Sequence, residues 1–385
     1  MKTFNKLALL LIMALAMTAF FTSCEKDDDL SSGGTPRIKY IRVTNPTSSD
    51  SLLIGAGQGQ LIAIIGEHLG GAKTMWFNNQ PATLNPTYVT NTSIIVNVPT
   101  PIPTEISNKM KIYFANGDSL LYDFQVQIAK PSVNSMVSEF VNTGEVATIR
   151  GDFFYAPLTV TFAGGVTGQL VSVADKIIQV RVPAGAQAGS VTVKTNFGET
   201  VSDFWFRDNR NIFISSDPFT GWWNSSYVIT PSMVVAGDPL TINGNYIRFK
   251  KPIGGWSWNE VAGGPADAMG AISKNIPNEA ILKPSDYNLK FEVNTIKPYT
   301  TNMLKINVGL LRENNDQYTW KPPYDTKGQW QTVIIPFEEV AASYGAPLVV
   351  SATGYWTRLL FHGPGDLDAD ISFDNFRVVP KIIKK

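Results

Sequence analysis

The sequence has few of the residues that most metal and redox sites need. Its 385 residues include one cysteine, Cys24, and two histidines. A single cysteine forms no intramolecular disulfide, and the chain has no HExxH motif, CxxC pair or histidine cluster for zinc or haem. Phosphate loops of the GxxxxGK[ST] and GxGxxG types are also missing. We therefore expect a functional site without a metal ion and without a cofactor.

The chain also lacks net charge. Its 32 basic residues balance its 32 acidic residues, and no basic stripe is present. Binding to phosphates needs clustered Lys and Arg, so we expect no nucleic acid partner. With 44% hydrophobic and 17% charged residues, the chain is typical of globular proteins, and its length suits two or three domains.

The N-terminus begins with a basic segment and continues into a short apolar run. Lys2 and Lys6 precede residues 7–21, which are apolar apart from Thr18. About 15 residues is short for a membrane span and typical of a signal peptide. An N-terminal transmembrane anchor is the alternative.

The end of this run, Phe21-Thr22-Ser23-Cys24, resembles a bacterial lipoprotein lipobox, although Phe21 replaces the usual Leu. The resemblance implies that residues 1–24 are the signal peptide and lipobox, with Cys24 as the lipidated mature N-terminus. Residues 25–37 read as an acidic and Ser/Gly-rich linker. The acidic run at 25–29 resembles the surface-export signal of Bacteroidetes lipoproteins. This implies an outer membrane lipoprotein exposed at the cell surface.

Residues 38–206 contain a repeat made of short β-type segments. Three segments of the first copy recur 84 to 85 residues later: 61–69 and 146–154, 76–78 and 161–163, 94–99 and 178–183. These units resemble IPT/TIG immunoglobulin-like domains, which implies two tandem β-sandwiches at 38–128 and 130–206. Their short junctions favour a spacer over a flexible chain. We expect Trp76 and Trp205 to lie in a core or at a domain junction, and His68 to be structural.

Residues 207–385 read as one further β-domain. Segments of five to eight residues alternate between apolar and polar side chains, as antiparallel strands with one buried face do. Short helices are expected at 278–282 and 336–344. Asp366, Asp368, Asp370 and Asp374 have the spacing of oxygen ligands for calcium, but the EF-hand glycine and terminal Glu are missing. A solvated loop is the alternative that we prefer there.

Tryptophan is concentrated in this last domain, which holds seven of the nine. Two groups lie beside Gly and Asn, residues that favour turns: Trp222 and Trp223 before Asn224, and Trp256 and Trp258 before Asn259. In an extended segment the rings of Trp256 and Trp258 would share one side. Trp rings suit the apolar faces of sugars, and neighbouring amides suit their hydroxyls. A third aromatic segment holds three further candidates: Tyr318, Trp320 and Tyr324. We expect Trp330 in the core and leave Trp356 open.

The motifs around Gly328 to Phe337 and in the last strand, Phe373 to Val378, resemble carbohydrate-binding modules with a jelly-roll fold. Together with the lipobox and the repeats, the chain resembles surface glycan-binding proteins of Bacteroidetes polysaccharide-utilisation loci. The fold expected is therefore all-β: two tandem immunoglobulin-like sandwiches followed by a jelly-roll-like sandwich. The resemblance implies non-catalytic binding of a β-glucan-backbone polysaccharide such as xyloglucan, beside a SusC/SusD-type importer. A glycoside hydrolase and a structural adhesin are the alternatives.

Overall fold

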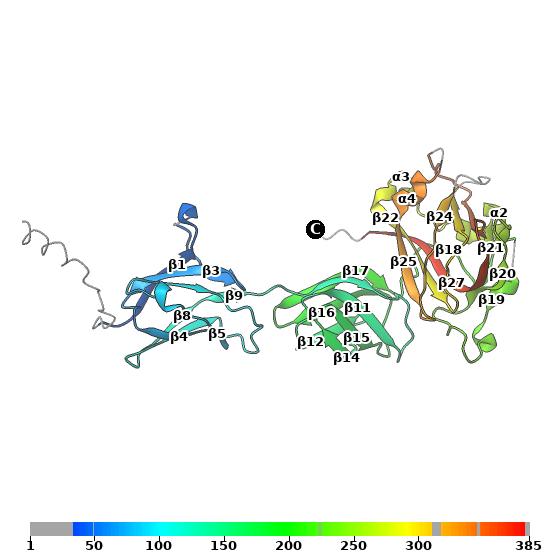
Figure 1. The fold of residues 1–385 in the computed structure, drawn as a ribbon. Helices are drawn as coiled ribbons and strands as arrows, with labels where there is room; N and C mark the ends of the chain where they lie inside the picture. Colours follow the sequence, from blue (N-terminus) through cyan, green and yellow to red (C-terminus); the bar gives the residue numbers. More distant parts are fainter. Residues whose placement is uncertain (1–33, 49, 223–224, 310–316, 345–346, 382–385) are drawn as a thin grey trace, which may run out of the picture. The chain divides into compact units, whose positions relative to one another are not determined.

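The protein was analysed as a computed structural model that describes residues 34–48, 50–222, 225–309, 317–344 and 347–381 (Figure 1). These residues form an all-β protein with a few short helices, which confirms the predicted fold class. The chain divides into two compact units, 1–128 and 129–385. The predicted signal peptide, Cys24 and most of the linker lie outside the described residues. Within them, no helix combines the length and apolar character needed to cross a membrane.

The first unit is a β-sandwich with its own core. One sheet contains β1 (Arg37–Val43), β3 (Leu61–Glu67) and β6 (Ser93–Asn97). The other contains β5 (Gln80–Ala82), β4 (Ala72–Phe77), β7 (Lys109–Phe114) and β8 (Ser119–Asp123). A parallel pair, β2 (Gly55–Gly57) with β9 (Gln125–Gln127), and the turns η1 (Pro46–Ser48) and η2 (Pro86–Tyr88) complete it. Trp76 lies on the outward side of β4 and is 37% exposed, so it does not lie in the core of this sandwich.

The second unit begins with another β-sandwich. One sheet has the order β10 (Ser132–Met136), β11 (Val146–Asp152), β15 (Ile177–Arg181) and β14 (Gln169–Ala174). The other has β13 (Val166–Thr167), β12 (Leu158–Phe162), β16 (Gly189–Thr195) and β17 (Gly198–Phe206). Alternate residues of these strands fill a separate core between the two sheets. Trp205, on β17, is partly buried beneath the guanidinium of Arg210, 3.6 Å from the ring centroid.

The two sandwiches repeat one another in backbone detail. His68 and Phe153 occupy matching positions and both have left-handed φ angles, 57° and 61°. Matching glycines precede them by two residues. A Cβ on Gly66 would lie 2.1 Å from the carbonyl oxygen of Arg37, and one on Gly151 would lie 1.8 Å from that of Ser132. The close approach of a neighbouring strand therefore explains both glycines.

The rest of the second unit is a larger sandwich. One sheet has the order β19 (Val228–Ile229), β20 (Tyr246–Ile253), β27 (Leu367–Pro380), β22 (Tyr287–Thr295) and β25 (Gln331–Pro336), and β18 (Ile212–Ile214) also pairs with β27. The other has β21 (Asn259–Gly264), β26 (Trp356–Phe361), β23 (Leu304–Gly309) and β24 (Tyr318–Trp320). Their facing apolar side chains form one core.

Short helical segments lie in the connections between the strands of this sandwich. They are η3 (Ser225–Tyr227), η4 (Pro231–Met233), α2 (Ala266–Met269), η5 (Gly270–Lys274), α3 (Asn278–Leu282), η6 (Pro284–Asp286) and α4 (Phe337–Ala342). The helices predicted at 278–282 and within 336–344 are thus confirmed.

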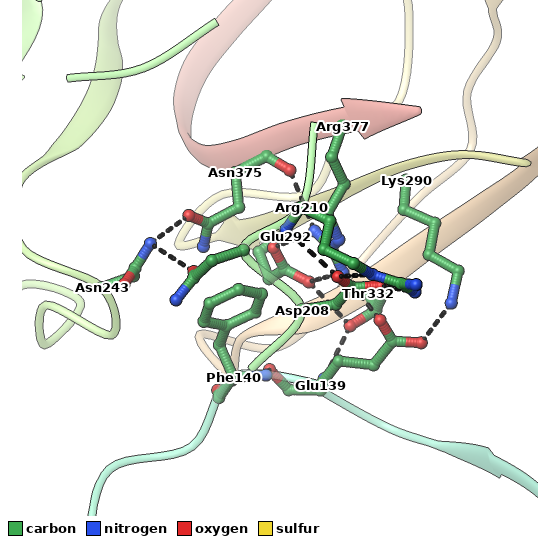
Figure 2. A network of polar contacts seen from close by, with 12 residues as sticks. Glu139, Phe140, Asp208, Arg210, Asn243, Lys290, Glu292, Thr332, Asn375 and Arg377 are labelled. Carbon is green, nitrogen blue, oxygen red and sulfur yellow. Dashed lines mark hydrogen bonds and ion pairs between the residues drawn. The ribbon is translucent and has the colours of Figure 1, made fainter. Parts of the chain in front are cut away.

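A buried ionic network joins the second sandwich to this larger one (Figure 2). Glu139, in the segment between β10 and β11, accepts hydrogen bonds from Lys290 Nζ at 2.6 Å and Arg377 Nη2 at 2.7 Å. Arg377 Nη1 also donates to Glu292 Oε2 at 2.8 Å. Thr332 Oγ1 links the two glutamates, accepting from the Glu139 backbone N–H at 2.7 Å and donating to the Glu292 carboxylate at Oε1 at 2.9 Å. None of the four charged residues is more than 5% exposed.

The charges of this network balance only when both sandwiches contribute. Burial lowers the pKa of Arg377, but the carboxylates of Glu292 and Glu139 outweigh burial and leave it raised. The guanidinium also lies 5.1 Å from the centroid of the Phe140 ring. Because a buried charge without a partner is costly, the second sandwich and the larger one support each other.

Candidate functional site

An exposed group of aromatic side chains lies at the turn between β20 and β21. Trp256 is 61% exposed and Trp258 is 48% exposed. Both rings contact His362, with centroid separations of 5.5 Å and 5.2 Å. The segment forms a turn and not the extended strand considered above, since Ser257 N donates to the carbonyl of Gly254 at 3.2 Å.

Hydrogen bonds hold this turn in place. Trp256 has a left-handed φ of 59°, which is unusual for a large side chain, and its N–H donates to the Gly363 carbonyl at 2.6 Å. Gly255 N donates to Asp366 Oδ1 at 2.8 Å. Asn259 Nδ2 donates to Ser257 Oγ at 2.8 Å. Asn259, predicted to contact the ligand, therefore supports the turn in this structure. A strained residue fixed by its surroundings is characteristic of functional loops.

A buried polar layer lies beneath Trp258. The indole Nε1 donates to Glu260 Oε1 at 2.8 Å, and the Arg358 guanidinium lies 5.1 Å from the centroid of the ring. Arg358 in turn donates to Asn307 Oδ1 at 3.0 Å and to Gln317 Oε1 at 3.4 Å. Burial raises the pKa of Glu260, although Arg358 and the Trp258 hydrogen bond oppose this. The layer fixes the Trp258 ring at the surface.

A second aromatic group lies at the other end of the β21–β26 pair. Trp222 is 57% exposed and packs edge-to-face on Trp356 with a centroid separation of 5.5 Å. The Trp222 amide donates to the Gly263 carbonyl at 3.1 Å. A Cβ on the preceding Gly221 would lie 2.4 Å from the same carbonyl, so only glycine permits this approach.

Both groups lie on one side of the sheet. Trp356 and Arg358 alternate along β26 with the core residue Leu359, so they point away from the core. Asn259 pairs with Phe361 at one end of β21 and Gly264 with Thr357 at the other. Five residues of strand correspond to about 16 Å. We call this surface the aromatic face, and it consists of Trp222, Trp256, Trp258, Trp356 and His362.

The structure corrects the third predicted aromatic segment. Trp320 is 7% exposed and packs in the core against Phe291, Tyr299 and Tyr324. Tyr318 and Tyr324 are half-buried and pack against the same core. The segment that begins at Tyr318 is strand β24, and its pairing with β23 turns Tyr318 and Trp320 toward the core.

Other predicted residues have other outcomes. Trp223 and Asn224 lie outside the described residues. Trp330, expected in the core, is only half-buried. It donates from Nε1 to the Leu240 carbonyl at 2.8 Å.

The four aspartates with calcium-like spacing do not form a cluster. Asp370 pairs with Arg248 at 2.8 Å, Asp368 pairs with Lys297 at 2.5 Å, and Asp374 is buried elsewhere on β27. Within the described parts of the chain, no group of three or more His, Cys, Asp or Glu could hold a metal ion.

Sequence reasoning missed His362 and three members of the polar layer, Arg358, Asn307 and Gln317. The signal was present in β23 and β26, where Lys305, Asn307 and Arg358 alternate with apolar residues on the side away from the core. Burial lowers the pKa of Lys305, and the nearby Arg358 lowers it further.

A β-sandwich that presents fixed, exposed tryptophans along one sheet has a surface suited to ligands with flat apolar faces. Comparison with known proteins finds a family model that matches this domain. Residues 206–380 match the family described as surface glycan-binding protein B xyloglucan binding domain. The predicted resemblance is thus confirmed: the chain is similar to surface glycan-binding proteins of type B.

The chain is also similar to one curated protein and to two solved structures. An IPT/TIG domain-containing protein of Bacteroides ovatus is 33% identical over 139 residues, which are 34% of this chain and 28% of that protein. The surface glycan-binding protein PbSGBP-B of Prevotella bryantii has a TM-score of 0.68 at 23% identity, over 91% of this chain and 100% of that chain. A surface glycan-binding protein B of Bacteroides uniformis has a TM-score of 0.48 at 18% identity, over 90% and 100% of the two chains.

Proposed function

We propose that the chain binds a neutral polysaccharide at the cell surface without transforming it, and that the aromatic face is the binding site. The observation that carries the proposal is the pair of exposed rings, Trp256 and Trp258, fixed around His362. Sugar rings stack their C–H faces on such indoles, and rigid rings lose little entropy on binding.

The separation of the two aromatic groups supports an extended ligand. A single sugar cannot reach from Trp258 to Trp222 across about 16 Å of strand, but a polysaccharide chain can lie along β21 and contact both. The family match supports xyloglucan, or another glycan with a β-glucan backbone, as the ligand.

The polar layer has a positioning role in this proposal. Glu260 and Arg358 hold the Trp258 ring from below, while the ligand contacts the ring from outside. Glycoside hydrolysis needs two carboxyl groups facing each other across the scissile bond, and Glu260 is instead engaged with Trp258 and Arg358. Reducing-sugar release from xyloglucan by the purified chain would contradict the non-catalytic proposal.

The location and partners follow from the sequence resemblance and the family. We propose an outer membrane lipoprotein, anchored through Cys24 and exposed at the cell surface. A SusC/SusD-type importer is the proposed recipient of the captured glycan. Metabolic labelling with a palmitate analogue should modify the wild-type chain and not Cys24→Ser, while surface proteolysis of intact cells tests exposure.

Affinity electrophoresis through gels with and without xyloglucan tests the binding itself. We expect xyloglucan to retard the wild-type chain, and the Trp256→Ala/Trp258→Ala double variant to lose most of the retardation. Trp76→Ala is the matched control, because Trp76 is an exposed tryptophan on the first sandwich. Equal retardation of all three proteins would exclude the aromatic face as the site.

A further inference from the structure

A crevice lies between the second sandwich and the larger sandwich that follows it, away from the aromatic face. We call this larger sandwich the C-terminal domain. Its volume is about 410 Å³, at the lower end of the range of small-molecule sites, which favour domain junctions. The second sandwich contributes Phe140, Asn142 and Val146 to the lining, and the C-terminal domain contributes Asp238 and Trp330 among others. Neither domain forms the crevice alone.

One wall of the crevice is a fixed aromatic ring. Trp330 packs edge-to-face on the buried Tyr246 at a centroid separation of 5.5 Å. Its Nε1 donates to the Leu240 carbonyl at 2.8 Å, which fixes the rotation of the ring. The half-buried ring therefore lines the crevice as a stable apolar surface of the kind that sugar rings pack on.

Hydrogen-bonding groups line the rest of the crevice. Asn294 also lines it, is 1% exposed, and its Oδ1 has no hydrogen-bond partner in the described parts of the chain. Buried polar atoms are normally paired, so an orphaned acceptor in a cavity lining indicates a ligand or an ordered water. The hydrogen bond from Arg248 lowers the pKa of Asp238, so this second lining residue is a carboxylate at neutral pH. Acceptors of this kind match hydroxyl donors.

The network at Glu139 makes the crevice rigid. The next residue, Phe140, forms part of the wall, and Glu139 binds both Lys290 and Arg377 across the junction (Figure 2). Asn142 Nδ2 adds a second link by donating to the Thr241 carbonyl at 2.8 Å. A site that is formed before binding loses less entropy when the ligand arrives.

We propose that this crevice is a second saccharide site that binds a small part of a neutral glycan, such as a chain end or a side branch. The ring of Trp330 would pack on the sugar, and Asp238 and Asn294 would accept hydrogen bonds from its hydroxyls. A carboxylate in the lining disfavours anionic ligands. The class of ligand rests on the proposed function, but the crevice is a separate site from the aromatic face.

Calorimetric titration of the mature chain with a xylogluco-oligosaccharide tests the proposal. The Trp256→Ala/Trp258→Ala double variant removes two exposed rings of the aromatic face, so that binding at the crevice can be measured without them. Val146→Trp, added to it, fills the crevice from a lining residue that is 37% exposed. Val171→Trp is the matched control, because Val171 is 49% exposed on β14 of the same sandwich and does not line the crevice.

The proposal predicts residual binding by the double variant, which falls at least tenfold with Val146→Trp and stays unchanged with Val171→Trp. If Val146→Trp leaves the residual binding unchanged, the proposal of a saccharide site in the crevice is wrong. A double variant that binds nothing also overturns it, while supporting the aromatic face. If the wild-type chain binds no oligosaccharide, both proposals fail. If the double variant binds like the wild type and Val146→Trp abolishes binding, the crevice is the principal site and the aromatic face is not.

Discussion

Replacing Glu139 with Gln should destabilise the second unit strongly. The glutamate supplies an anion to two cations, Lys290 and Arg377, that are 5% and 0% exposed. Arg377 keeps Glu292 as a partner, but Lys290 loses the carboxylate 2.6 Å from its ammonium group. Removing one partner of a buried pair costs about 3–5 kcal/mol, so we expect a loss of that size in the free energy of unfolding.

Urea-induced unfolding of the mature chain, followed by tryptophan fluorescence, measures this loss. Asp368→Asn is the control, because Asp368 pairs with Lys297 at the surface, where the two side chains are 66% and 48% exposed. Such surface pairs contribute about 0–1 kcal/mol. Adding Lys290→Met to Glu139→Gln removes the uncompensated charge and should recover part of the loss. If Glu139→Gln changes the unfolding free energy no more than Asp368→Asn does, the network does not hold the two sandwiches together.

Three further predictions concern other residues. Burial raises the pKa of Asp374 well above its ordinary value of 3.8. The folded state therefore keeps a proton that the unfolded state loses. Because of this difference, the free energy of unfolding falls as the pH rises above about 4. Asp374→Asn should flatten this fall, as unfolding measured from pH 4 to pH 8 would show, and an unchanged pH slope would exclude the buried acid. Gly66→Ala should lower the free energy of unfolding by about 1–3 kcal/mol through overpacking. Gly57→Ala is the control: no atom lies closer than 4.0 Å to its new Cβ, so its loss should be below about 1 kcal/mol. Equal shifts of the thermal unfolding midpoint in the two variants would refute the close approach at Gly66. Trp222→Ala should reduce retardation by polysaccharide more than binding of a short oligosaccharide, and equal effects on both would argue against a ligand that spans the two aromatic groups.

Much of the fold could be predicted because its signals are local. Alternating segments identified the strands, and the 85-residue repeat identified two related sandwiches. Residues such as Gly66 and Gly151 recur because each copy needs the same close approach of backbone. The helix at 278–282 also follows from its own sequence.

The site was predictable only in part, because exposure depends on strand pairing. Turn residues correctly placed Trp256 and Trp258 at the surface. The same reasoning failed for Trp320, because polar residues before it suggested a loop while pairing with β23 turned its ring into the core. Arg358 reaches Trp258 from a strand 100 positions away in the sequence, and Glu139 reaches Arg377 across 238 positions. Contacts of that range leave no pattern in a single sequence.

Titration of xyloglucan into the wild-type chain and into Trp256→Ala and Trp258→Ala shows whether the aromatic face binds the glycan. Aromatic hot spots contribute about 2 kcal/mol or more, which corresponds to a loss of about thirtyfold in affinity. We expect that loss for at least one of the two variants, and wild-type affinity for Trp76→Ala. Wild-type affinity in both Trp256→Ala and Trp258→Ala would contradict the assignment of glycan binding to the aromatic face.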